Sequence, residues 1–144
     1  MTASQIAQRN HQVEKISALK STVLNTANGI NITEDLKFMF LSFIDDMTVT
    51  ELKIIEVCGG PISFAKRHHL QTSIHEKRNI ILDFAFSERV EKKDIYDLFA
   101  KNLNAKGLLK VDHLTLAGTS SDNPMRVTTP LGDEFFSFIK NPIL

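Results

Sequence analysis

The sequence predicts a mostly α fold of the α+β class, in which several helices accompany a single β-hairpin near the C-terminus. Apolar residues recur at steps of three or four along most of the chain, which is typical of amphipathic helices. Three threonines, Thr33, Thr48 and Thr129, stand immediately before such runs, where helix-capping residues are expected. The segment 108–128 instead contains two β-like stretches around a turn-rich loop, and it therefore predicts the hairpin.

Length and composition indicate one ordinary domain, residues 1–144. The 144 residues are 42% hydrophobic, which suffices for one core, and seventeen Lys and Arg balance seventeen Asp and Glu. No global charge therefore draws the protein to nucleic acid or to a membrane surface. Cys58 is the only cysteine, which excludes an intramolecular disulfide and fits a reducing cytoplasm. No signal peptide and no apolar run of roughly 20 residues is present, so a cytoplasmic protein without a membrane span is expected.

The first predicted element is an N-terminal amphipathic helix within residues 1–30. Its apolar residues recur at helical spacing from residue 4 to about residue 27, and Asn28-Gly29 is a helix stop. Lys20 falls where a strict heptad needs an apolar residue, so a long coiled coil is not favoured. A role in covering the domain and a role in homodimer formation both remain open. The apolar residues are Val13, Ile16, Leu19 and Val23.

Two further helices follow, each with a clear start. Glu34 and Asp35 after Thr33 suit the positive end of a helix that carries Phe40 and Ile44 on its buried side. Thr48-Val-Thr-Glu51 is a capping box for a third helix, about 49–58, which Gly59-Gly60-Pro61 ends. This third helix is expected to direct Leu52, Ile55 and Cys58 inward.

Residues 61–88 are ambiguous, because short apolar runs fit a buried helix or a strand equally well. A helical interpretation is favoured, with Lys66, Arg67 and His68 forming a secondary basic patch on the outside. The adjacent histidines of this segment point about 100° apart on a helix, so one metal ion would not bind both, and no metal site is expected.

The C-terminal third has the clearest order. A helix over 92–105, with Ile95, Leu98 and Phe99 on one face, ends before Gly107, where a left-handed residue is expected. Strands over 108–116 and 125–128 flank the loop 118–124 and form the predicted hairpin. Thr129 then caps a last helix with Pro130 at its first position. Its apolar face contains Leu131, Phe135, Phe138 and Ile139.

This order resembles the second half of winged-helix regulators of the MarR and PadR families. Leu103-Asn-Ala-Lys-Gly107-Leu108 is similar to the end of their recognition helix, and Thr129-Pro-Leu-Gly132 is similar to the helix start that follows their wing. The resemblance covers mainly residues 90–139 and implies a winged-helix-like portion over 48–140. It implies a transcriptional regulator whose recognition helix enters the major groove of double-stranded DNA.

On this sequence, the resemblance and the distribution of basic residues give six candidate DNA-binding positions. Residues 61–110 hold ten Lys and Arg against six Asp and Glu, so the middle of the chain is modestly basic. Asp94 and Asp97 share the helix, however, and the predicted wing tip 118–124 carries no Lys or Arg. The candidates are Lys92, Lys93, Lys101, Asn102, Lys106 and, in the wing, Arg126.

An alternative is a protein-interaction adaptor that uses the same fold without binding DNA. The stretch 36–61 looks like small bacterial proteins of mobile elements and phage defence, which suggests another protein as the partner. No catalytic site and no cofactor are expected, because the sequence contains neither a Gly-x-Ser-x-Gly turn nor a phosphate-binding Gly-x-x-x-x-Gly-Lys loop. A pocket that gathers Asp45, Asp46 and the histidines would be needed to favour an enzyme.

Overall fold

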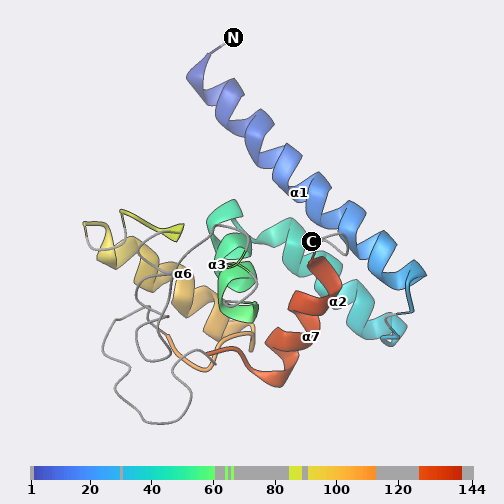
Figure 1. Ribbon diagram of the computed structural model, residues 1–144. Helices are drawn as coiled ribbons and strands as arrows, with labels where there is room; N and C mark the ends of the chain where they lie inside the picture. Colours follow the sequence, from blue (N-terminus) through green and yellow to red (C-terminus); the bar gives the residue numbers. More distant parts are fainter. Residues whose placement is uncertain are drawn as a thin grey trace.

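The computed structural model describes residues 2–29, 31–60, 64, 66, 85–88, 91–112 and 127–140, and only the backbone of 6–12. This part of the chain is built from helices that surround a shared core (Figure 1). The first helix, α1, packs mainly against the last, α7, and also contacts α2 and α3, while α3 contacts α7 and α6. The helices are α1 (Ala3–Ala27), α2 (Glu34–Asp46), α3 (Val49–Gly59), α6 (Lys93–Ala105) and α7 (Pro130–Ile139).

The predicted helix starts at the three threonines are confirmed. Thr33 Oγ1 accepts a hydrogen bond from the backbone N–H of Leu36 at 3.3 Å. Thr48 and Glu51 form the expected capping box, in which the threonine hydroxyl accepts from the Glu51 N–H at 3.1 Å. Thr129 accepts from the Gly132 N–H at 2.9 Å. These caps satisfy N–H groups that the first turn of a helix leaves unpaired.

The junction between α6 and α7 is fixed by backbone geometry. Gly107 has a φ of 78°, a left-handed conformation that glycine adopts without a steric penalty, and it turns the chain after α6. Thr129 Oγ1 donates to the backbone carbonyl of Gly107, so the cap of α7 is also bonded to the end of α6. The two helices are thereby held together before α7 begins at Pro130.

The prediction of an α+β fold with a β-hairpin wing was wrong. The described residues contain no β-strand, and Leu109 and Thr128 form a single antiparallel bridge. The pairing cannot continue beyond Thr128 toward the C-terminus, because Thr129 already caps a helix and Pro130 has no N–H to donate to a strand partner. The predicted wing tip 118–124 and Arg126 lie outside the described residues.

The core is centred on phenylalanines from α2 and α7. Phe40 packs against Phe135 at 5.1 Å between ring centroids, edge to face, and against Phe138 at 5.5 Å. All three rings are fully buried, and Cys58 is buried nearby as the sequence predicts. Aliphatic side chains from α2, α3, α6 and the segment after α6 complete the core: Ile44, Ile54, Ile55, Leu103, Leu108 and Leu109.

The predicted face of α6 differs from that in the structure. On α6, Leu103 is buried, but Ile95 and Leu98 are exposed, and the inner side is completed by Ala100 and the half-buried Tyr96. Tyr96 packs edge to face on Phe86 at 5.6 Å, which fixes the side of α6 that turns inward. Most of the predicted helical segment 61–88 lies outside the described residues.

Candidate functional site

The start of α6 is the first place predicted to bind DNA. Lys92 and Lys93 are both exposed, and Lys92 Nζ forms an ion pair with Glu88 at 2.9 Å. That pair, through a hydrogen bond and charge attraction, raises the pKa of Lys92. Burial raises the pKa of the Tyr96 hydroxyl on the next turn. Lys92 is therefore already paired with an acid of the same chain, Glu88.

The rest of α6 presents charges of both signs. Lys101 and Asn102 are exposed, but Lys101 lines a shallow hollow of about 320 Å³ together with Asp94, Asp97 and Asp112. Lys106 is half-buried and lies 3.9 Å from the carboxylate of Asp46. Three acids around one exposed lysine weaken the attraction of this face for phosphate groups.

Only part of the predicted secondary basic patch can be placed. Lys66 is exposed, whereas Arg67 and His68 lie outside the described residues. Within the part of the chain that the structure describes, no group of three or more His, Cys, Asp or Glu side chains could hold a metal ion.

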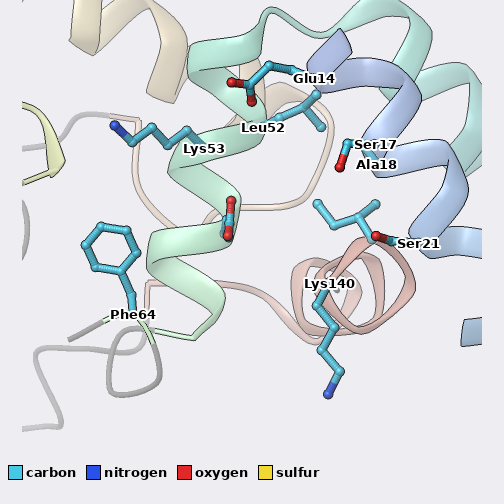
Figure 2. Close-up of a pocket in the computed structure, with 10 residues that line it drawn as sticks. Glu14, Ser17, Ala18, Ser21, Leu52, Lys53, Phe64 and Lys140 are labelled. Atoms are coloured by element: carbon cyan, nitrogen blue, oxygen red, sulfur yellow. The ribbon is translucent and has the colours of Figure 1, made fainter. Parts of the chain in front are cut away.

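A groove of about 380 Å³ runs between α1, α3 and the end of α7 (Figure 2). Figure 2 shows Ser17 and Ser21 of α1 turned toward this groove, across from Leu52 of α3. Charged groups of both signs, Glu14 and Lys53 among them, stand at its margin, so the groove does not select an anion or a cation. The full lining is Glu14, Ser17, Ala18, Ser21, Leu52, Lys53, Glu56, Phe64, Ile139 and Lys140.

The face of α1 turned to the body of the protein is polar. Ser21, Thr22 and Asn25 expose only 7%, 4% and 2% of their surface. Asn25 Nδ2 donates to the backbone carbonyls of Phe138 at 2.9 Å and Lys140 at 2.7 Å, and so pairs carbonyls that the end of α7 leaves free. Small side chains let α1 approach α7 closely, and the amide supplies the specific bonds.

The opposite face of α1 is apolar and faces solvent. Val13, Ile16 and Val23 are exposed by 60%, 50% and 69%, and Leu19 and Leu24 by 40% and 45%. With about 100° between successive residues of a helix, these five residues lie on the side opposite Ser21, Thr22 and Asn25. We call these five residues the outer face of α1. The amphipathic helix is thus packed with its polar side inward.

An exposed aromatic side chain, Phe38, lies on α2 near two acids. Phe38 is exposed by 67%, and the exposed Glu34 and Asp35 stand one turn before it on the same side of the helix. Lys15 of α1 donates to the backbone carbonyl of Asp45, which ties α1 to the end of α2.

Sequence reasoning identified the apolar residues of α1 but not the side on which they lie. The missed signal is the second stripe, Ser21, Thr22 and Asn25, whose spacing of one, three and four residues marks a continuous helical face. Apolar periodicity alone predicts that the apolar side is buried. A stripe of small residues that includes one amide is also able to pack closely, and here it does.

Comparison of this chain with protein-family models, with curated proteins and with solved structures found no match. Among the described residues, every helix is too short or too polar to cross a lipid bilayer.

Proposed function

We propose that this protein is a protein-interaction adaptor and that the outer face of α1 is its docking surface. The observation that carries the proposal is the reversed packing of α1, which buries Ser21, Thr22 and Asn25 and exposes Val13, Ile16 and Val23. A row of exposed apolar side chains, here interrupted by Lys20, is a common feature of binding sites, because the exposure of such side chains to water is unfavourable.

The spacing of the outer face suits a helical partner. Val13, Ile16 and Val23 stand at positions i, i+3 and i+10, and they form one line along the helix. Apolar anchors at helical spacing are the means by which amphipathic helices bind grooves or other helices. The partner is therefore expected to present an apolar helix or groove rather than a charged surface.

The position of α1 also supports docking. In Figure 1 its N-terminal turns extend beyond the other helices. The helix α1 has 25 residues and packs on the body over only part of its length. Helical turns without tertiary contacts are only marginally stable in water, since isolated helices shorter than about 12 to 15 residues barely form. A bound partner would stabilise those turns.

Site-specific photo-cross-linking in the cells that make the protein tests this proposal. A photoreactive residue at Val23, on the outer face, is expected to give a discrete cross-linked species, and the same residue at the exposed Lys110 is not. Ile16→Glu places a charge in the middle of the outer face and should remove the cross-link from position 23.

Leu98→Glu is the matched control, because Leu98 is an equally exposed apolar residue on α6. It should leave the cross-link from position 23 unchanged, and both variants should retain the circular dichroism of the parent protein. Equal cross-linking from positions 23 and 110, or a cross-link that survives Ile16→Glu, would overturn the proposal.

Binding of DNA through α6 is the competing hypothesis from the sequence. It is supported by the exposure of Lys93, Lys101 and Asn102 on one helix. It is weakened by the acids beside Lys101 and by the absence of a hairpin among the described residues. The suggested context for an adaptor, a mobile element or a phage-defence system, stays a prediction from the likeness of residues 36–61 alone.

A further inference from the structure

We infer that the groove between α1, α3 and the end of α7 is a binding site for a short peptide with free termini, held in an extended conformation. This site is separate from the proposed docking surface, because the described lining of the groove includes none of the five residues of the outer face of α1. Three observations support it: an unpaired buried hydroxyl, apolar walls across from α1, and opposite charges at the two ends of the groove.

Ser21 has a hydroxyl that points into the groove and has no hydrogen-bond partner among the described residues. The residue exposes only 7% of its surface, and Figure 2 shows its side chain directed toward the groove. Its neighbours Thr22 and Asn25, by contrast, both donate to backbone carbonyls. A buried hydroxyl is normally hydrogen-bonded, because leaving it unpaired costs free energy. A carbonyl or N–H group of a bound peptide would supply the partner.

The walls across from α1 are apolar. Leu52, Phe64 and Ile139 line the groove and expose only 8%, 5% and 9% of their surface. On the side of α1, the small side chains of Ser17 and Ala18 leave room. Ligand sites commonly combine apolar walls with a few polar groups that fix the orientation of the ligand. This groove therefore offers one side to an apolar side chain and the other side to a peptide backbone.

The two ends of the groove carry opposite charges. In Figure 2, Glu14 lies at one end and Lys140 at the other, with the serines of α1 between them. Both are exposed, and neither forms an ion pair with a residue that the structure describes. Lys53 is engaged elsewhere, because its Nζ donates to the carbonyl of Ala85 at 2.9 Å, and Glu56 also has a partner. The free charges at the ends favour a ligand with a cation at one end and an anion at the other.

The length of the groove matches about three extended residues. Glu14 and Ser21 are seven residues apart on α1, which corresponds to about 10 Å at a rise of about 1.5 Å per residue. An extended chain spans about 3.3 to 3.6 Å per residue, so a tripeptide covers that distance. Its ammonium group would lie near Glu14, its carboxylate near Lys140, and its middle side chain against Leu52 and Phe64.

Titration of the isotope-labelled full chain with the tripeptide Ala-Leu-Ala, followed by NMR, tests the inference. We expect the backbone amide signals of Ser17, Ser21 and Lys53 to shift, with a dissociation constant on the order of 0.1 mM, which is an affinity that a ligand of this size can reach. The amide signal of Lys101 on α6 should not move. No shift in the signals around the groove at up to about 10 mM peptide would overturn the inference.

Two further peptides test which parts of the ligand are recognised. Acetyl-Ala-Leu-Ala-amide has no charge at either end and should bind about five-fold more weakly, since each exposed ion pair contributes little. Ala-Glu-Ala keeps both end charges but has no apolar side chain, and it should bind about ten-fold more weakly. Equal affinity for the three peptides would contradict the proposed site.

Variants of the protein test the residues. Ser21→Ala removes the hydroxyl and should weaken binding of Ala-Leu-Ala about five-fold. Ser42→Ala makes the same change at an exposed position of α2 and should leave the affinity unchanged. Glu14→Gln alters an exposed residue, so the fold is expected to persist, and it should weaken binding of Ala-Leu-Ala about three-fold but not that of the capped peptide. Unchanged affinity in both Ser21→Ala and Glu14→Gln would show that the peptide does not occupy the groove.

Discussion

Gly132 is the residue at which α7 passes closest to the end of α6. A methyl group added at its α-carbon would lie 2.1 Å from the backbone carbonyl oxygen of Leu108, which cannot move aside as a flexible side chain would. That carbonyl also accepts a hydrogen bond from the Thr129 N–H at 3.1 Å. The glycine is therefore needed for space rather than for an unusual backbone angle.

Gly132→Ala is expected to destabilise the protein by about 3 kcal/mol, because the clash involves two segments of backbone. Gly29→Ala is the matched control. No atom lies within 4 Å of the added methyl group there, and only the left-handed φ of 97° opposes it, at about 1 kcal/mol.

Urea unfolding followed by circular dichroism measures both changes. A Gly132→Ala variant no less stable than Gly29→Ala would show that the contact with Leu108 does not constrain α7.

At the scale of single residues, the sequence predicted the helix caps but not the close contacts between distant segments. The caps at Thr33, Thr48 and Thr129 were predicted correctly, because each depends on residues within one turn of the threonine. The requirement for glycine at position 132 could not be predicted, since the oxygen that would clash with a methyl group belongs to Leu108, which is far away in the sequence.

At the scale of the helix, Asn25 joins α1 to the C-terminal end of α7. Its amide donates two hydrogen bonds to the carbonyls of Phe138 and Lys140, and the residue is almost fully buried. Few other groups on the inner face of α1 can replace these donors, because its neighbours are small hydroxyl residues.

Asn25→Ala is expected to destabilise the protein by about 2 kcal/mol, since the buried carbonyl of Phe138 and the partly buried carbonyl of Lys140 lose their donor. Asn25→Asp should destabilise it further, because a carboxylate has no N–H and would face two carbonyl oxygens. Thermal unfolding gives both values, and Thr26→Ala, at an exposed neighbour, should change stability by no more than about 0.5 kcal/mol. Similar losses for Asn25→Ala and Thr26→Ala would contradict this account.

The helices themselves were predictable, but the sides that they bury were not always so. Periodicity gave the range of α1 within one residue and identified its apolar residues, but it did not identify the polar stripe of Ser21, Thr22 and Asn25. It could not tell which face meets the body, because that depends on how closely α7 can approach. The same limit explains Ile95 and Leu98, which are exposed because Tyr96 packs on Phe86 and turns the other side of α6 inward.

Across the whole molecule, charge is balanced, and this bears on the DNA hypothesis. A protein that binds duplex DNA through basic residues of α6 should bind at low salt and should lose affinity after the double change Lys93→Glu, Lys101→Glu. With three acids beside Lys101, we instead expect a dissociation constant weaker than about 10 μM even at low salt.

Fluorescence anisotropy with labelled duplexes distinguishes the two outcomes. The matched control is Lys110→Glu, which changes an exposed lysine just beyond α6. Tight binding that the double change abolishes and the control retains would establish α6 as a DNA-binding helix and would contradict our expectation.

The pairing of segments that lie far apart in the sequence was the hardest feature to predict. The sequence suggested a wing, but Leu109 and Thr128 form one bridge and no strand among the described residues. Pairing of distant segments depends on where the chain returns in space, and local patterns carry little of that information.

The hydrogen bonds from Asn25 to the end of α7 bear on the order in which the helices pack during synthesis of the chain. Their acceptors lie 113 and 115 residues later in the chain, so during translation α1 leaves the ribosome long before its docking site exists. Because contacts between residues so distant in sequence form late, α1 is expected to be among the last helices to settle on the body. Until then the polar inner face of α1 and its apolar outer face are both exposed to water.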